Sequence, residues 1–103
     1  MSSVEVGETS GLTNLRAKRD EILRVAANHG ASNVRVFGSF ARGTARAGSD
    51  IDLLVDFEPG RTLIDHIRLW RDLEALIGSG VDVISARGLT DRDSDIREDA
   101  LTI

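Results

Sequence analysis

The chain has 103 residues, which is the size of one small domain. It contains no cysteine, so disulfide scaffolds and cysteine-bound zinc sites are excluded. The formal net charge of −4 disfavours a general nucleic-acid binder, because such proteins usually carry a basic surplus, and we expect no direct nucleic-acid binding. With two histidines in the chain, a metal ion would have to be held by carboxylates, which suggests Mg²⁺ or a similar hard cation.

No apolar run approaches the roughly 20 residues that a membrane-spanning helix requires. The first residues lack the basic and apolar regions of a signal peptide. The sequence therefore predicts a cytoplasmic protein that does not associate with membranes.

The chain is expected to consist of a flexible N-terminus over 1–11 and one folded domain over 12–103. Apolar residues at helical spacing predict a helix from Leu12 to His29, and Gly30 stands where a C-terminal cap belongs. A short β-branched run predicts a strand over 33–37.

After the Gly38–Ser39 corner we expect a short helix from Phe40 to Ala45. A loop of small residues around 47–49 then leads to a second strand over 50–57, and Pro59–Gly60 is a turn signal.

The longest helical pattern in the chain covers 62–77. Its apolar stripe is expected to pack on a sheet, with Trp70 in the core, and a ligand groove is the alternative interpretation of the same stripe. Arginines on this segment are expected to form a solvated face, or alternatively to meet an acidic partner. The stripe consists of Leu63, Ile67, Trp70, Leu73 and Ile77, and the arginines are Arg61, Arg68 and Arg71.

A third strand is predicted over 81–85 and a polar helical segment over 91–99. The apolar end, Ala100–Ile103, either folds onto the core or joins an interface. The alternation of helices and strands predicts an α/β fold, in which a small sheet is flanked by helices, and it leaves the strand directions open.

Two carboxylates are expected to share one face of the second strand. Asp50 and Asp52 are two residues apart, so their side chains point the same way. Aspartate is depleted in strands and like charges repel, so a divalent cation between the two would stabilise the pair. A solvated strand end is the alternative. If the strand containing Asp82 lies beside this one, a third carboxylate reaches the same point.

The Gly38–Ser39 corner lies where a strand turns directly into a helix. Glycine allows a phosphate to approach the main chain, and the start of a helix favours negative charge. Ser39 adds a hydroxyl donor, and Arg42 is one turn further on. A tight corner without a ligand is the alternative, but the Asp-x-Asp pair eleven residues later places a metal site and a phosphate cradle on one edge of the sheet.

The segment from Gly38 to Gly43, followed by Ser49-Asp50-Ile51-Asp52, resembles the minimal nucleotidyltransferases of the DNA polymerase β superfamily. Val81-Asp82-Val83 resembles the later strand that carries their third carboxylate. The resemblance covers residues 12 to 103 and implies a polymerase-β-like nucleotidyltransferase fold with a mixed sheet. It also implies two Mg²⁺ ions and transfer of a nucleoside monophosphate from a triphosphate.

The same resemblance implies roles for individual residues. Asp50, Asp52 and Asp82 would hold metal and carry catalysis, and the nucleotide-binding residues would be Gly38, Ser39, Arg42 and Ser49.

Small members of this family are often encoded beside a HEPN-domain ribonuclease toxin and act as its antitoxin. The resemblance implies that the chain moves AMP from ATP to a hydroxyl of that partner, expected to be a tyrosine. One alternative is an antitoxin that neutralises the partner by binding alone. Another is a nucleotidyltransferase for a small molecule such as an aminoglycoside, which the short length disfavours because it leaves no room for a domain that holds the acceptor.

Overall fold

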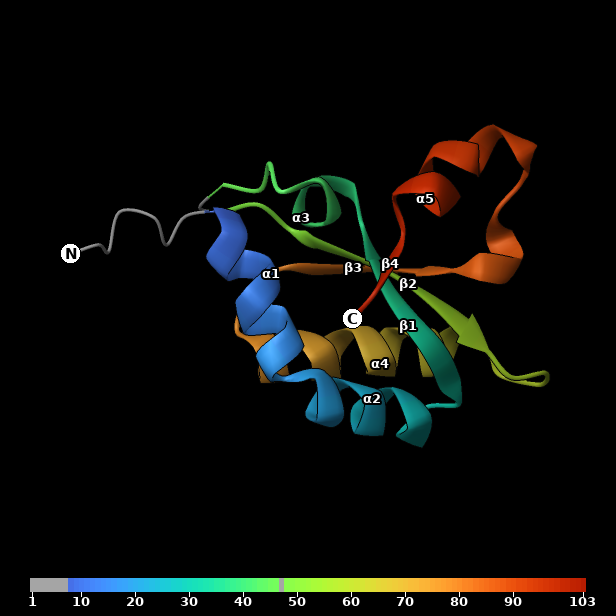
Figure 1. Cartoon of the computed structure of the whole chain (residues 1–103). Coiled ribbons are helices and arrows are strands. Elements are labelled where there is room, and N and C mark those ends of the chain that lie inside the picture. The colour runs from blue at the N-terminus through green and yellow to red at the C-terminus, as the bar shows by residue number, and fades with distance from the viewer. Residues whose placement is uncertain (1–7, 47) are drawn as a thin grey trace.

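A four-stranded sheet in the order β3-β2-β1-β4 forms the centre of the molecule (Figure 1). The structure, a computed structural model, describes residues 8–46 and 48–103. Residues 1–7 of the expected flexible N-terminus and Ala47 of the expected loop therefore lie outside the described residues. The strands are β1 (Ala31–Phe37), β2 (Ile51–Phe57), β3 (Val81–Ser85) and β4 (Leu101–Thr102).

The sheet is mixed, as the resemblance implied. Strand β1 runs antiparallel to both β2 and β4, whereas β2 and β3 are parallel. A parallel pair needs a crossover connection, and α4 (Leu63–Ile77) supplies it. Residues 62 and 65 cap this helix, since the Thr62 amide donates to Asp65 Oδ2 at 2.8 Å.

The prediction of one continuous helix from Leu12 to His29 is wrong. The chain forms α1 (Glu8–Ala17) and α2 (Arg19–Asn28), with a break at Lys18. The Lys18 ammonium donates to the carbonyl oxygen of Leu76 at 3.0 Å, at the C-terminal end of α4. A distant contact thus accompanies the bend, and local apolar spacing carries no signal for it.

Two other helical segments differ in their bounds. The short helix α3 spans Gly38–Arg42 rather than Phe40–Ala45, because Gly43 adopts a left-handed conformation (φ 75°) and caps it. The predicted C-terminal helix is divided into a 3₁₀ turn, η3 (Asp91–Asp93), and α5 (Ser94–Asp99). A further 3₁₀ turn, η2 (Ala86–Gly88), follows β3.

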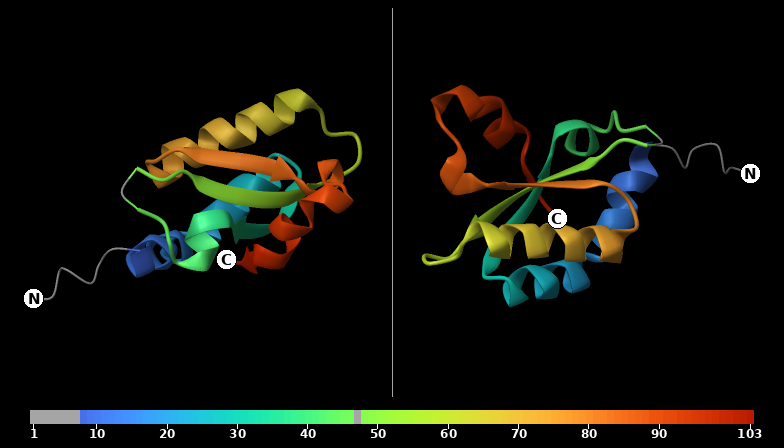
Figure 2. Two further views of the ribbon diagram at one scale, coloured as in Figure 1. Left: turned by 90° about the horizontal axis from the view of Figure 1, so that it is seen from above. Right: turned by 180° about the vertical axis from the view of Figure 1, so that it is seen from behind.

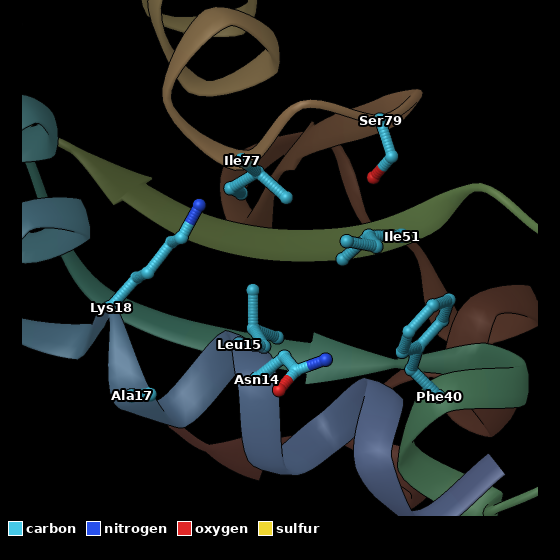
Figure 3. Close-up of a pocket in the computed structure, with 8 residues that line it drawn as sticks. All are labelled: Asn14, Leu15, Ala17, Lys18, Phe40, Ile51, Ile77 and Ser79. Atoms are coloured by element: carbon cyan, nitrogen blue, oxygen red, sulfur yellow. The ribbon is translucent and has the colours of Figure 1, made fainter. Parts of the chain in front are cut away.

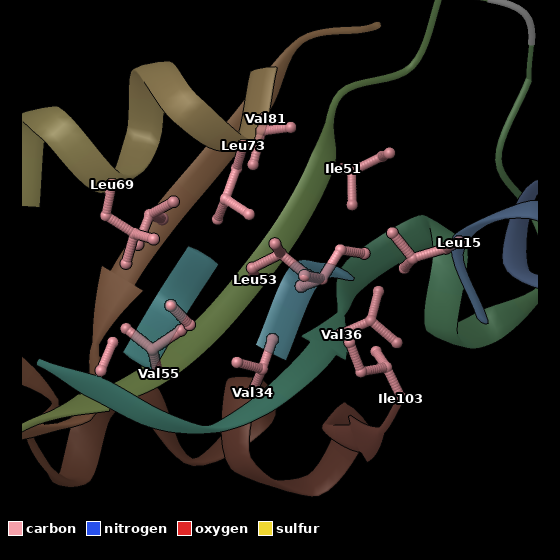
Figure 4. Packing of buried hydrophobic residues seen from close by; sticks show 14 residues of the cluster. Leu15, Val34, Val36, Ile51, Leu53, Val55, Leu69, Leu73, Val81 and Ile103 are labelled. Atoms are coloured by element: carbon pink, nitrogen blue, oxygen red, sulfur yellow. The ribbon is translucent and has the colours of Figure 1, made fainter. Parts of the chain in front are cut away.

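Helices α2 and α4 cover one face of the sheet, and α3 and α5 lie on the other side (Figures 1 and 2). The main core lies between the sheet and the first pair (Figure 4). Alternate residues of β2, namely Ile51, Leu53 and Val55, point into it and meet Leu69 and Leu73 of α4. The faces of β2 are thereby fixed by the two-residue period of a strand.

The apolar stripe of α4 is only partly buried. Leu73 is fully buried, but Leu63, Ile67 and Trp70 are 71%, 38% and 39% exposed, so the expectation that Trp70 belongs to the core is wrong. The reason is the position of α4 beside β3, which is an edge strand. The sheet ends beneath the helix, and no described element covers its outer side.

The C-terminal residues fold onto the core. Leu101 and Thr102 pair with β1, a strand that the sequence analysis did not predict, and Ile103 is buried in the main core. Among the described residues, no helix has both the length and the apolarity needed to cross a membrane.

Candidate functional site

Two of the predicted carboxylates lie side by side on the face of the sheet opposite the main core. Asp52 of β2 and Asp82 of β3 are register partners in the parallel ladder. Asp52 is half-buried, whereas Asp82 and Asp50, one residue before β2, are exposed. We call the surface formed by these three side chains the carboxylate face. The prediction that a neighbouring strand would bring Asp82 to Asp52 is confirmed.

The electrostatics of this face centre on Asp52. Burial raises the pKa of its carboxyl group, and the negative charges of Asp82 and Asp50 raise this pKa further. A hydrogen-bond interaction with Asp82 acts in the same direction, and the guanidinium of Arg42 opposes it. The charged form of Asp52 is therefore disfavoured by its neighbours, and a bound cation would relieve the repulsion.

Glycines allow two of the carboxylates to lie against the main chain. A Cβ atom added at Gly38 would clash with Oδ2 of Asp52, and one added at Gly80 would clash with Oδ1 of Asp50. Gly38 also has a φ of 70°, which side-chain-bearing residues rarely adopt. Gly38 was predicted as a phosphate contact, whereas Gly80 was not predicted as part of the site; its position directly before the Asp82 strand was the available signal.

The donor chemistry of the carboxylate face fits a hard divalent cation, since its three side chains all offer carboxylate oxygens. Within 8–46 and 48–103, however, no three acidic, histidine or cysteine side chains are gathered closely enough to hold a metal ion. The carboxyl group of Asp50 lies against Gly80, whereas Asp52 and Asp82 face one another. The three predicted ligands are therefore neighbours that do not form a closed cluster.

The Gly38–Ser39 corner forms the first turn of α3, directly after β1. The Ser39 carbonyl oxygen accepts a hydrogen bond from the Thr44 amide at 2.9 Å, which fixes the loop that follows the helix. The Ser39 hydroxyl forms no hydrogen bond within the described part of the chain. It is thus available to an incoming ligand.

Arg42 is bound to another element of the protein. Its Nη1 atom donates to Oδ2 of Asp99 at 2.5 Å, so α5 is tied to α3. The guanidinium nevertheless lies near enough to Asp52 to offset part of the rise in the pKa of that carboxyl group. Asp99 was not predicted as part of this region, and its distance from Arg42 in sequence gives no signal for the contact.

Ser49 closes the turn that precedes β2. Its hydroxyl accepts a hydrogen bond from the Arg46 amide at 2.9 Å, and its own amide donates to the Arg46 carbonyl at 2.9 Å. These contacts position the start of β2, immediately before Asp50.

A cavity of 420 Å³ is lined by none of the seven predicted site residues (Figure 3). It is lined by α1, α3, β2 and the end of α4, and includes Lys18, Phe40 and Ile51. The side chain of Ile51 points to the core side of β2, opposite to that of Asp52. This cavity therefore does not open onto the carboxylate face.

Comparisons with known proteins agree with this geometry. A family described as nucleotidyltransferase domain matches residues 20–85, a range that includes every predicted site residue. The chain is 38% identical over 72 residues to MJ0435 of Methanocaldococcus jannaschii, to which protein adenylyltransferase activity is provisionally assigned; the match covers 70% of this chain and 77% of that protein. It is 45% identical over 60 residues to the protein adenylyltransferase MntA of Thermococcus cleftensis, covering 58% of this chain and 61% of the relative.

Solved structures have the same fold. A structure provisionally described as a minimal nucleotidyltransferase superimposes with a TM-score of 0.80 at 53% identity, covering 89% of this chain and 95% of the other. A crystal structure of a toxin–antitoxin with AMP-PNP gives a TM-score of 0.70 over 82% of this chain and 70% of the other. At 21% identity, the second likeness is one of fold alone.

Proposed function

The chain belongs to the nucleotidyltransferase domain family, and on this premise we propose that it is a protein adenylyltransferase that moves AMP from ATP to a hydroxyl group of a partner protein. The observation that carries the proposal is the register of Asp52 and Asp82 on adjacent parallel strands. Paired carboxylates beside a glycine-serine corner suit a reaction in which a cation and a triphosphate are held together.

Each predicted residue has a part in this proposal. Asp50, Asp52 and Asp82 would hold Mg²⁺, which when bound would stabilise the charge that develops on the attacking and leaving oxygens. Gly38 and the hydroxyl of Ser39, which has no hydrogen-bond partner among the described residues, would contact the triphosphate. This assignment is supported by the pKa of Asp52, which burial raises first and the charges of Asp82 and Asp50 raise further, so that a cation would favour its charged form.

The remaining two residues support the triphosphate site less directly. Arg42 would have to exchange its contact with Asp99 for one with a phosphate. Ser49 would act by positioning Asp50, since its hydroxyl accepts a hydrogen bond within its own turn.

In the proposed reaction the acceptor hydroxyl attacks the α-phosphorus of ATP in line with the leaving group. The new bond joins the acceptor oxygen to this phosphorus, and the bond to the bridging oxygen of the β-phosphate breaks, so that pyrophosphate leaves. Asp82 is at the exposed side of the pair and would accept the proton of the hydroxyl. The products are an AMP-modified protein and pyrophosphate.

For the partner we propose a HEPN ribonuclease toxin, modified on a tyrosine and silenced, with the chain acting in the cytoplasm as its antitoxin. Support comes from the relatives: one is named protein adenylyltransferase MntA, and one structure of the same fold is a toxin–antitoxin with AMP-PNP.

The proposal is tested by incubating the chain with Mg²⁺, ATP and the protein encoded by the neighbouring reading frame. A label on the α-phosphate should appear in that protein, and a label on the γ-phosphate should not. The Asp52→Ala variant should fold and transfer no label. Transfer by Asp52→Ala at the wild-type rate would contradict the proposed site. If the Asp50→Ala/Asp52→Ala protein still protected cells from the partner, neutralisation would depend on contact rather than on chemistry.

A further inference from the structure

An exposed apolar strip runs along the outer side of α4. It consists of Leu63, Ile64, Ile67 and Trp70, and we call it the α4 strip. Ile64 is 59% exposed. The other three belong to the stripe that was predicted to pack on the sheet, and they are exposed as described above. Four large apolar side chains on one helix, each at least 38% exposed, are typical of an interaction surface.

A groove joins this strip to the carboxylate face. Its volume is 290 Å³, and it lies between α4 and the free edge of β3. It is lined by Leu63, His66, Ile67, Trp70, Asp82 and Val83. The groove thus leads around the edge of the sheet to Asp82, the residue that would meet the acceptor hydroxyl.

The edge of β3 is already partly occupied by side chains of α4. His66 Nε2 donates to the carbonyl oxygen of Val83 at 2.6 Å, and Glu74 Oε2 accepts from the Val81 amide at 3.1 Å. These bonds hinder another strand from pairing with β3 along this edge. The surface is therefore suited to a partner that presents apolar side chains, such as one face of a helix.

The charges around the strip indicate what kind of segment it would accept. Arg68 and Arg71 are exposed on α4, and Arg87 lines a second groove that shares Leu63 and His66 with the first. None of these three arginines forms an ion pair within the described ranges. Glu58, which also lines the second groove, is paired with Arg61, and Asp82 lies at the end of the first groove. The arginines that border the strip therefore complement an acidic segment and would repel a basic one.

We propose that the α4 strip and its groove dock an apolar segment of the acceptor protein that is flanked by acidic residues, and so bring its hydroxyl group to Asp82. The inference rests on the proposed function for the identity of the acceptor. A second copy of the chain is the less suitable occupant, because a symmetric contact through this strip would place the same positively charged arginines close together.

The test compares Leu63→Glu with the matched control Ala75→Glu, which introduces the same charge at another exposed position of α4, outside the groove. Leu63 is the first residue of the helix, where a glutamate is favourable, so we expect this variant to fold. Binding is measured by calorimetry with the protein from the neighbouring reading frame, and Mg²⁺-ATP binding is measured separately.

For Leu63→Glu we expect the Kd for the partner to rise about tenfold or more, with the Kd for Mg²⁺-ATP unchanged. Ala75→Glu should leave both values within about twofold. The charge-reversed variant Arg68→Glu/Arg71→Glu should also weaken binding, and its effect should diminish at high salt.

Unchanged partner binding by Leu63→Glu, or no binding by the wild-type chain, would overturn the docking proposal. So would a wild-type dimer in solution that Leu63→Glu converts to a monomer, because the occupant would then be a second copy. If the wild type binds the partner and transfers no AMP, while Leu63→Glu loses binding, the docking proposal holds and the proposed function fails.

Discussion

The two faces of strands β2 and β3 perform different tasks with alternate residues of the same segments. On one face, Leu53 and Val83 pack against the helices. On the other, Asp52 and Asp82 lie side by side, and burial together with the charge of Asp82 raises the pKa of Asp52. A register error of one residue would bury the carboxylates and expose the apolar side chains. The packing that stabilises the fold therefore also places the candidate site.

The separation of the two faces is tested first by a substitution on the core face. Leu73→Ala removes a fully buried side chain and leaves a cavity, so the free energy of unfolding should fall by about 2–5 kcal/mol. Transfer per folded molecule should change little, since Leu73 points away from the carboxylate face. Urea denaturation gives the first quantity, and an assay with labelled ATP gives the second. A large loss of transfer in fully folded protein would show that the two faces are not separable.

Gly38→Ala tests the contact between the β1–α3 corner and Asp52. The positive φ should destabilise the protein by about 1–2 kcal/mol, and the clash of Cβ with Asp52 should reduce transfer as well. Gly43→Ala is the matched control, because Gly43 has a φ of 75° with nothing near its Cβ position. Equal losses of transfer in the two variants would contradict a specific role for the space at Gly38.

The raised pKa of Asp52 on the carboxylate face should make the stability of the protein depend on pH. The folded state raises the pKa of Asp52, so it binds that proton more tightly than the unfolded chain does. The free energy of unfolding of the metal-free protein should accordingly decrease as the pH rises from the ordinary range of an aspartate through the raised pKa. Asp52→Asn should remove this decrease and should be at least as stable as wild type at neutral pH. If Asp52→Asn were less stable than wild type at neutral pH, the charged form of Asp52 would not be disfavoured by burial and by its neighbouring carboxylates.

The smallest effect is expected at the start of α4, remote from the carboxylates. The Thr62 amide lowers the pKa of Asp65, so this group contributes stability above the ordinary carboxyl range that is lost as the pH falls through its lowered pKa. Asp65→Ala should lower the urea midpoint slightly at neutral pH, and the difference from wild type should shrink in acid. An equal difference at both pH values would assign the effect to packing instead.

The parts of the fold that follow from local pattern were predictable. The two-residue period placed Asp50 and Asp52 on one side of the chain, whereas the approach of Asp82 to Asp52 was predicted only for the case that their strands are neighbours, as they are. The Gly38–Ser39 corner was visible because a strand ended at a glycine. The Asp50–Asp52 spacing and the Gly38–Ser39 corner depend on a few consecutive residues, whereas the Asp82 contact depends on strand pairing.

The features that sequence reasoning missed are set by contacts between distant segments. The bend at Lys18 accompanies a bond to Leu76, and the restraint on Arg42 comes from Asp99. The exposure of Trp70 depends on where the sheet ends beneath α4, which helical spacing cannot reveal. Strand β4 is only two residues long and gives no periodic signal.

The most direct test of AMP transfer by the carboxylate face is the intact mass of the partner protein after incubation with Mg²⁺-ATP and either the wild-type chain or its Asp52→Asn variant. We predict that the partner gains the mass of AMP with the wild-type chain and stays unmodified with Asp52→Asn, although the variant is folded. Addition of AMP by Asp52→Asn at the wild-type rate would contradict the assignment of chemistry to the carboxylate face.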